Sequence, residues 1–329
     1  MKKHNQRGMA MLVVLMITAM MTITAVNMND YWLRALNRAA STQFYQQSKW
    51  LLLSMESLVQ HQQLSRLPQD KIHLGQSWAK PEQQISLDGN QVNFSLRDRQ
   101  ACFNLNGIGQ SGEVGEKSET PTQAPAPPYS QQVFQHLLLA QGLDAAEAQK
   151  ITLALADWVD KDTLSRSGNH EADLYRDSRP KLIPANRPML DTSEFRVLAG
   201  VNQALFLRLK PLICALPNQN LHININTLSQ TQAPLLAALF LGEMSLEEAQ
   251  QLIEHRPATG WNHINDIKPF IAVNNAAFAK AQTAMSLTSN YFELLQWLDE
   301  EQQSSRMRSL FQRHEHVIQV LSRQYGHSD

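Results

Sequence analysis

An apolar, charge-free run near the amino terminus constrains this chain more than any other feature. No charged residue occurs over Met9–Asn29, and the basic residues Lys2, Lys3 and Arg7 precede the run. As a helix, about 20 residues at about 1.5 Å each span about 30 Å, the thickness of a bilayer's hydrocarbon core. The run is too long for a secretory signal, and Ala25-Val26-Asn27 is a poor cleavage site. We expect the basic residues to stay cytoplasmic and the rest of the chain to face outward.

The helical pattern continues beyond this run. Apolar residues recur at helical spacing from Tyr31 to Val59, and neither Pro nor Gly interrupts the chain between Met9 and Pro68. The sequence therefore predicts one helix over residues 9–65. Its first half is apolar enough for a membrane, and its second half is amphipathic.

A basic leader, then Gly8, then an apolar helix resembles the amino terminus of type IV pilins and pseudopilins. In that family a prepilin peptidase cuts after the Gly, the new terminus is methylated and the helix is kept. The resemblance implies a leader over residues 1–8 and processing between Gly8 and Met9. The alternative is an uncleaved signal anchor.

The fifth residue after the expected cleavage site separates members of this family. Major pilins carry a Glu there, which is thought to pair with the amine of a neighbouring subunit, whereas this chain has Val13. A buried charge needs a partner, so an apolar residue suits a subunit with no neighbour above it. In this respect the chain resembles the K minor pseudopilins of type II secretion systems, the GspK family.

Composition and motifs argue against two classes of protein, nucleic-acid-binding proteins and enzymes. The net charge of the 329-residue chain is −1, which gives no general basic footprint for nucleic acid. The two cysteines, Cys102 and Cys214, would form a disulfide in an oxidising compartment. Two unrelated buried thiols are the alternative. No common hydrolase, zinc-protease or phosphate-loop motif is present, so we do not expect an enzyme.

The rest of the chain predicts an α+β protein. Val92, Phe94 and Leu96 alternate with polar residues after the Asp88-Gly89-Asn90 turn, which indicates a strand. The tail after residue 287 predicts two or three strands, with a helix over 298–312 as an alternative. We expect a pilin-like fold in which residues 66–101 and 287–329 form an antiparallel sheet behind the long helix. Residues 102–286 would be a large all-α insertion, with 110–130 as a loop or disordered excursion.

Two parts of the insertion resemble each other. "FNLN" at 103–106 and "ININ" at 223–226 each precede an apolar helix, a turn and a helix containing "EAQ". Asp144 and Ser245 are predicted N-caps of the second helices. The pattern indicates an internal duplication, or chance similarity between amphipathic helices. It also resembles helix-hairpin-helix modules that bind DNA, but the turns are acidic, which opposes phosphate binding.

An acidic loop follows the first of these units. Its carboxylates suit Ca²⁺, which takes hard oxygen ligands in flexible geometry, and a solvated loop with local ion pairs to Lys161, Arg166, Arg176 and Arg179 is an equal alternative from composition. The GspK resemblance favours calcium, carried by "DWVDKD", "EADLY" and "ANRP". It implies the ligands Asp157, Asp160, Asp162, Glu171, Asp173 and Asp177.

The same resemblance implies a role and partners. The protein would be an inner-membrane, single-pass minor pseudopilin with a periplasmic body, at the tip of the type II secretion pseudopilus. It would start assembly with the I and J minor pseudopilins, and also meet H and the prepilin peptidase. The resemblance also places the cysteines as a brace near the ends of the insertion. A membrane-anchored nucleic-acid-binding protein and a minor pilin of a type IV pilus are the alternatives.

Overall fold

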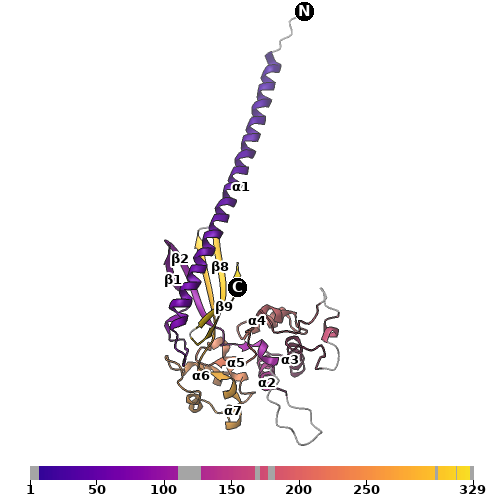
Figure 1. Ribbon diagram of the computed structural model, residues 1–329. Coiled ribbons are helices and arrows are strands. Elements are labelled where there is room, and N and C mark those ends of the chain that lie inside the picture. The colour runs from indigo at the N-terminus through magenta and orange to yellow at the C-terminus, as the bar shows by residue number, and fades with distance from the viewer. Residues whose placement is uncertain are drawn as a thin grey trace, which may run out of the picture.

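The computed structural model describes residues 7–109, 127–166, 171–176, 182–300, 303–315 and 317–326. A single helix, α1 (Arg7–Gln62), dominates its shape. The amino-terminal half of α1 projects away from the body, and the other half covers a sheet (Figure 1). Every described side chain from Met9 to Ala40 is exposed. Among the described residues, α1 is the one helix long and apolar enough to cross a membrane.

Five antiparallel strands form the sheet in the order β1-β2-β7-β8-β9. They are β1 (Gln83–Leu87), β2 (Asn90–Asp98), β7 (Tyr291–Glu300), β8 (Gln303–His314) and β9 (Val317–Tyr325). The strand expected around 91–97 is confirmed as β2. The tail forms three strands, so the helix considered for 298–312 is wrong.

Strand β1 was not predicted, because its "QQISL" sequence holds only two apolar residues, Ile85 and Leu87, and one such alternation is too short to indicate a strand. It forms as the partner of β2, with Leu87 opposite Asn90. Asp88 and Gly89 have φ values of 49° and 82°. Positive φ at both central residues is the requirement of the tight hairpin turn that matches the twist of a strand pair.

One apolar core joins α1 to the sheet. Leu52, Met55 and Val59 of α1 are fully buried in a cluster with Phe94 and Phe292 of the strands. This burial explains why the amphipathic half of α1 is helical, since an isolated helix gains little without a packed face.

A buried ion pair also ties α1 to the far side of the sheet. Glu56 is 3% exposed. Both of its oxygens accept hydrogen bonds from the Arg323 guanidinium on β9, and Ser309 on β8 donates a further one at 2.6 Å. The contact sets the position of α1 across β8 and β9.

The insertion lies between β2 and β7, at the end of the body away from the amino terminus (Figure 1). Its helices are α2 (Tyr129–Ala140), α3 (Ala145–Val159), α4 (Gln203–Leu209), α5 (Ala233–Ala238), α6 (Leu246–Glu254) and α7 (Asn275–Ala284). The predicted N-caps are present, because Asp144 accepts from the Glu147 amide at 2.8 Å and Ser245 from the Glu248 amide at 3.2 Å.

The expectation of an all-α insertion is wrong in one respect. Two short parallel pairs join the middle of the insertion to its start and to its end: β3 (Phe103–Asn104) with β4 (Ile213–Cys214), and β5 (Ile223–Asn224) with β6 (Met285–Ser286). Pairs of two residues leave no periodic signal in the sequence. They form because segments distant in the chain meet there.

In each of the two similar units, an asparagine side chain makes a pair of hydrogen bonds to the backbone of a distant residue. The Asn106 side chain donates to the Met189 carbonyl at 2.9 Å and accepts from its amide at 2.7 Å. The Asn226 side chain makes the same pair of bonds to Trp261, at 3.0 and 2.7 Å. Each unit therefore fixes a distant chain segment with the last Asn of its "NLN" or "NIN" motif.

The insertion meets the sheet at a polar junction centred on Asp98, at the end of β2. Its carboxylate accepts hydrogen bonds from the Gln100 amide and from the side chains of Asn224, Thr227 and Ser289. These donors come from the exit of β2, from the second unit and from the segment entering β7. The junction therefore joins all three.

Cys102 and Cys214 are bonded as a disulfide, with 5.8 Å between their Cα atoms. The disulfide packs with Leu216 and with Tyr291, the first residue of β7. It joins the start of the insertion to its middle, beside the return to the sheet. The alternative of two unrelated thiols is wrong.

Candidate metal centre

The acidic loop begins at the end of α3. Asp157 lies in the last turn of α3 and is 3% exposed. Its carboxylate accepts from the Ser165 hydroxyl at 2.7 Å and from the Arg166 guanidinium at 2.7 Å. Asp160 is the C-cap of the same helix, and its Oδ2 accepts from Arg166 at 2.6 Å.

A third carboxylate comes from Glu171, at the start of a short 3-10 helix (Glu171–Tyr175). The Glu171 amide donates to the Thr163 carbonyl at 3.4 Å, which folds the loop back on itself. One oxygen each of Asp157, Asp160 and Glu171 then lie within 4.8 Å of one another. These three residues are called the carboxylate cluster below.

The electrostatics of the cluster are unfavourable without a cation. Burial, followed by the charges of Asp160 and Asp157, raises the pKa of Glu171 to about 7. Burial likewise raises the pKa of Asp160, although its hydrogen bond to Arg166 opposes the rise. Arg166 supplies one positive charge to three acids, so the cluster retains an excess of negative charge.

Three oxygens of the cluster lack partners. Asp160 Oδ1 and both oxygens of Glu171 are buried, and none has a hydrogen bond of normal geometry with a described residue, although the nearby Asn186 side chain opposes the rise in the pKa of Glu171. Native proteins pair nearly all such atoms, so orphaned oxygens call for an explanation. Converging hard oxygen atoms are the kind of ligand that Ca²⁺ takes. The residues present therefore fit a calcium ion.

The other predicted ligands lie apart from the cluster or outside the described chain. Asp162 is exposed, and its carboxylate accepts from the Leu164 amide at 2.9 Å. Asp173 is paired with Arg176 at 2.5 Å. Asp177 lies outside the described residues. The local ion pairs expected of a solvated loop are thus present at Arg166 and Arg176, beside the buried cluster.

Asn186 and Arg166, which are not among the predicted ligands, also hold this loop together. Asn186 adopts a φ of 46°, and its side chain donates to the Asp162 carbonyl. Arg166 lies between two cluster acids and is 35% exposed at its side chain. Asp157 and Asp160 are three residues apart at the end of α3. This spacing is the one signal in the sequence that could have placed these two acids on the same side of the helix.

The expected processing site lies in the anchor. Gly8 and Met9 occupy the first turn of α1. Val13 is 53% exposed on the same helix, with no side chain of the body covering it. The structure thus leaves the apolar half of α1 free for a membrane or for neighbouring helices.

A long exposed apolar helix packed on an antiparallel sheet, with a helical insertion before the last strands, defines a pilin-like α+β protein. The family profile described as type II secretion system (T2SS), protein K, matches this chain over residues 101–218 and 223–288. The chain belongs to that family.

Individual relatives agree over nearly the full length. The type II secretion system protein K of Klebsiella pneumoniae is 35% identical, over 98% of this chain and 97% of the relative. That of Pectobacterium carotovorum is 33% identical, over 98% of both chains. A chain in the crystal structure of the GspK-GspI-GspJ complex from enterotoxigenic Escherichia coli matches with a TM-score of 0.75. It is 33% identical and covers 88% of this chain and 100% of that one.

Proposed function

We propose that this protein is the minor pseudopilin at the tip of the type II secretion pseudopilus. There it starts assembly with the I and J minor pseudopilins, with H below them, for the export of folded proteins across the outer membrane. The observation that carries the proposal is the family membership over nearly the whole chain. A solved relative crystallised with GspI and GspJ, which supports the same partners here.

The exposed half of α1 supplies the means of assembly. It would be held in the inner membrane first and would then pack with the α1 helices of the partners. The absence of a carboxylate at Val13 suits the top position, because no subunit above would offer an amine to pair with it. Val13→Glu is expected to fold normally and to impair secretion, and unchanged secretion would contradict this account of the tip.

Processing is the chemistry done to this chain. A prepilin peptidase would cleave between Gly8 and Met9 on the cytoplasmic side, and methylation would follow. The body would then lie in the periplasm. Gly8→Ala is expected to block leader removal, measured as a mobility shift in the membrane fraction, while Ala10→Gly serves as the matched control. Normal processing of Gly8→Ala would refute the pilin-type maturation.

Calcium is proposed as the ion of the carboxylate cluster. Asp157, Asp160 and Glu171 would hold it, and Asp162, Asp173 and Asp177 are further candidates. The bound ion would neutralise the cluster and make the loop rigid. Its support is the orphaned oxygens of Asp160 and Glu171 and the all-oxygen donor set.

The alternatives are less well supported. The α5–α6 turn of the second unit carries Glu243, and Glu247 and Glu248 follow in the first turn of α6, where a DNA-binding hairpin would face phosphates. A minor pilin of a type IV pilus would not match the protein K family over this length.

A further inference from the structure

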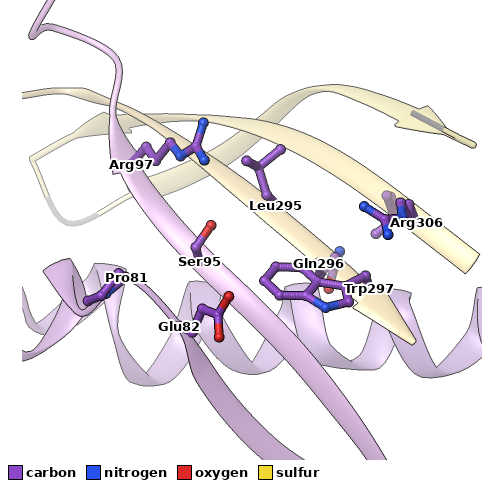
Figure 2. Close-up of a pocket in the computed structure, with 9 residues that line it drawn as sticks. Pro81, Glu82, Ser95, Arg97, Leu295, Gln296, Trp297 and Arg306 are labelled. Carbon is purple, nitrogen blue, oxygen red and sulfur yellow. The ribbon is translucent and has the colours of Figure 1, made fainter. Parts of the chain in front are cut away.

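A groove lies on the face of the sheet that α1 does not cover. Along β7, Leu294 and Leu298 belong to the core beneath α1, so the alternation of a strand places Leu295 and Trp297 on the opposite face. Figure 2 shows Trp297 and Leu295 over the strands, together with Arg97 and Arg306.

The groove has two connected parts. A cavity of about 250 Å³ is lined by Trp297, Arg306 and the segment before β1, among others. A larger cavity of about 660 Å³ continues between the sheet and the insertion. The two share Pro81, Ser95, Arg97 and Leu295. Together they form one elongated depression, called the outer-face groove below, from the β1 edge to the insertion.

The groove carries an excess of positive charge. Arg308 pairs with Asp191 at 2.9 Å, and Glu293 lies 3.8 Å from Arg308. By contrast, neither Arg97 nor Arg306 makes an ion pair with any described acid, and both are exposed.

Further along, Lys210 lines the larger cavity, also without an acid partner among the described residues. Glu82 lines the smaller cavity, but no ion pair joins it to either arginine in the described part of the chain. Five basic residues line the two cavities, Arg97, Arg99, Lys210, Arg306 and Arg308, against three acidic ones, Glu82, Asp98 and Glu293, which lies opposite Arg97 in the strand register. The groove therefore carries a net positive charge, which favours an anionic ligand.

An aromatic side chain lies beside one of these arginines, Arg306, and Leu295 separates it from Arg97. Trp297 is half-buried on β7, directly opposite Arg306 of β8 in the strand register. Beside it, Leu295 is also half-buried. Trp and Arg are the residues that most often carry the energy of a protein interface, and a half-exposed Trp offers a large apolar surface at small entropic cost.

We propose that the outer-face groove binds an extended, acidic segment of another protein. In an extended strand, side chains on one face recur about every 7 Å, so carboxylates can reach Arg97 and Arg306 while an apolar side chain lies on Trp297. The elongated, open shape suits a segment better than a compact small molecule. The site lies opposite α1, so its occupant does not compete with helices packed on α1, and the proposal stands apart from the tip assignment.

The test uses the full chain in detergent micelles and a fluorescein-labelled peptide that alternates glutamate with valine. Fluorescence anisotropy is expected to show salt-sensitive binding. The double variant Arg97→Glu with Arg306→Glu, and separately Trp297→Ala, should weaken it about tenfold or more. The matched control, Lys150→Glu with Lys280→Glu, makes the same charge change on exposed residues of α3 and α7 and should leave binding unchanged.

Three outcomes would overturn the proposal. The first is the absence of binding to the wild-type chain. The second is equal weakening by the control variant, which would mean that net charge and not the groove binds the peptide. The third is equally tight binding of inorganic polyphosphate or of vesicles containing phosphatidylglycerol, competing with the peptide, which would make the groove a general anion or lipid site. Circular dichroism of each variant confirms that loss of binding is not loss of fold.

Discussion

Two acidic sites in this protein, the junction at Asp98 and the carboxylate cluster, differ in how their carboxylate oxygens are used. At the junction, Asp98 accepts from four donors that belong to three chain segments. In the carboxylate cluster, Glu171 and Asp160 keep buried oxygens without hydrogen bonds among the described residues. Burial raises the pKa of Asp98 and of Glu171 alike. An acid whose oxygens are hydrogen-bonded thus links chain segments, whereas a group of acids with unpaired oxygens has the features of a cation-binding site.

The largest effect is expected at the disulfide beside the junction. Reduction, or Cys102→Ala with Cys214→Ala, should lower the free energy of unfolding by up to about 4–5 kcal/mol, because it frees a loop of about 110 residues in the unfolded chain. Chemical denaturation with and without a reductant measures this. The loss should be equal with and without calcium, since distant sites act additively. Two free thiols in the untreated protein would contradict the bond.

Calcium should have an effect of nearly the same size at the carboxylate cluster. An ion present at about a thousandfold its Kd stabilises by about 4 kcal/mol, seen as a calcium-dependent rise in Tm against a chelator. Asp160→Asn and Glu171→Gln should each abolish most of the rise. Asp144→Asn is the matched control, because Asn also caps a helix and Asp144 lies outside the cluster. If the calcium-dependent rise in Tm persisted in Glu171→Gln, the cluster would not be the calcium site and the loop would be an ordinary solvated loop.

The same measurement on Asp173→Asn sharpens the ligand set. Asp173 pairs with Arg176 apart from the cluster, so its loss should leave the calcium response nearly unchanged. A lost response would instead place Asp173 in the shell, as the family resemblance implies.

A moderate effect is expected at Asp98. Asp98→Asn replaces one acceptor oxygen by a donor that faces existing donors, which should cost about 2–3 kcal/mol. Urea unfolding measures the cost, and Asp299→Asn is the control, because Asp299 is exposed and accepts from Ser304. The calcium response should not change. If Asp98→Asn abolished the calcium response, the Asp98 junction and the carboxylate cluster would be energetically coupled.

The smallest effect is the pH dependence of the calcium-free protein. The pKa of Glu171 rises from 4.5 to about 7 on folding, so the native state binds more protons in that range. Stability should therefore fall gradually as the pH increases from about 4.5 to about 7. Thermal unfolding in chelator across this range should show the decline, and Glu171→Gln should flatten it. A rise in stability over the same range would reverse the assignment.

Local patterns predicted the parts that local physics decides. The apolar run, the absence of Pro and Gly before Pro68 and the N-caps Asp144 and Ser245 each act within a few residues, so the helix and the caps followed from the sequence. The alternation around Phe94 predicted β2 for the same reason. Strand β1 was not predicted because it is stabilised by its pairing with β2, which its own short sequence does not indicate.

The convergence of the carboxylate cluster could not be predicted from local sequence patterns. The sequence by itself determined a membrane-length helix joined to an α+β body, since hydrophobicity, helix breakers and strand alternation are local patterns, and the resemblance to pseudopilins implied the pilin-like arrangement. It named the acids of the loop but not the three that converge. Only the tertiary structure brought Asp157, Asp160 and Glu171 together, separated Asp173, and placed Arg306 beside Trp297. Burial and partner geometry depend on segments far apart in the chain, and those quantities decide which charges remain unsatisfied.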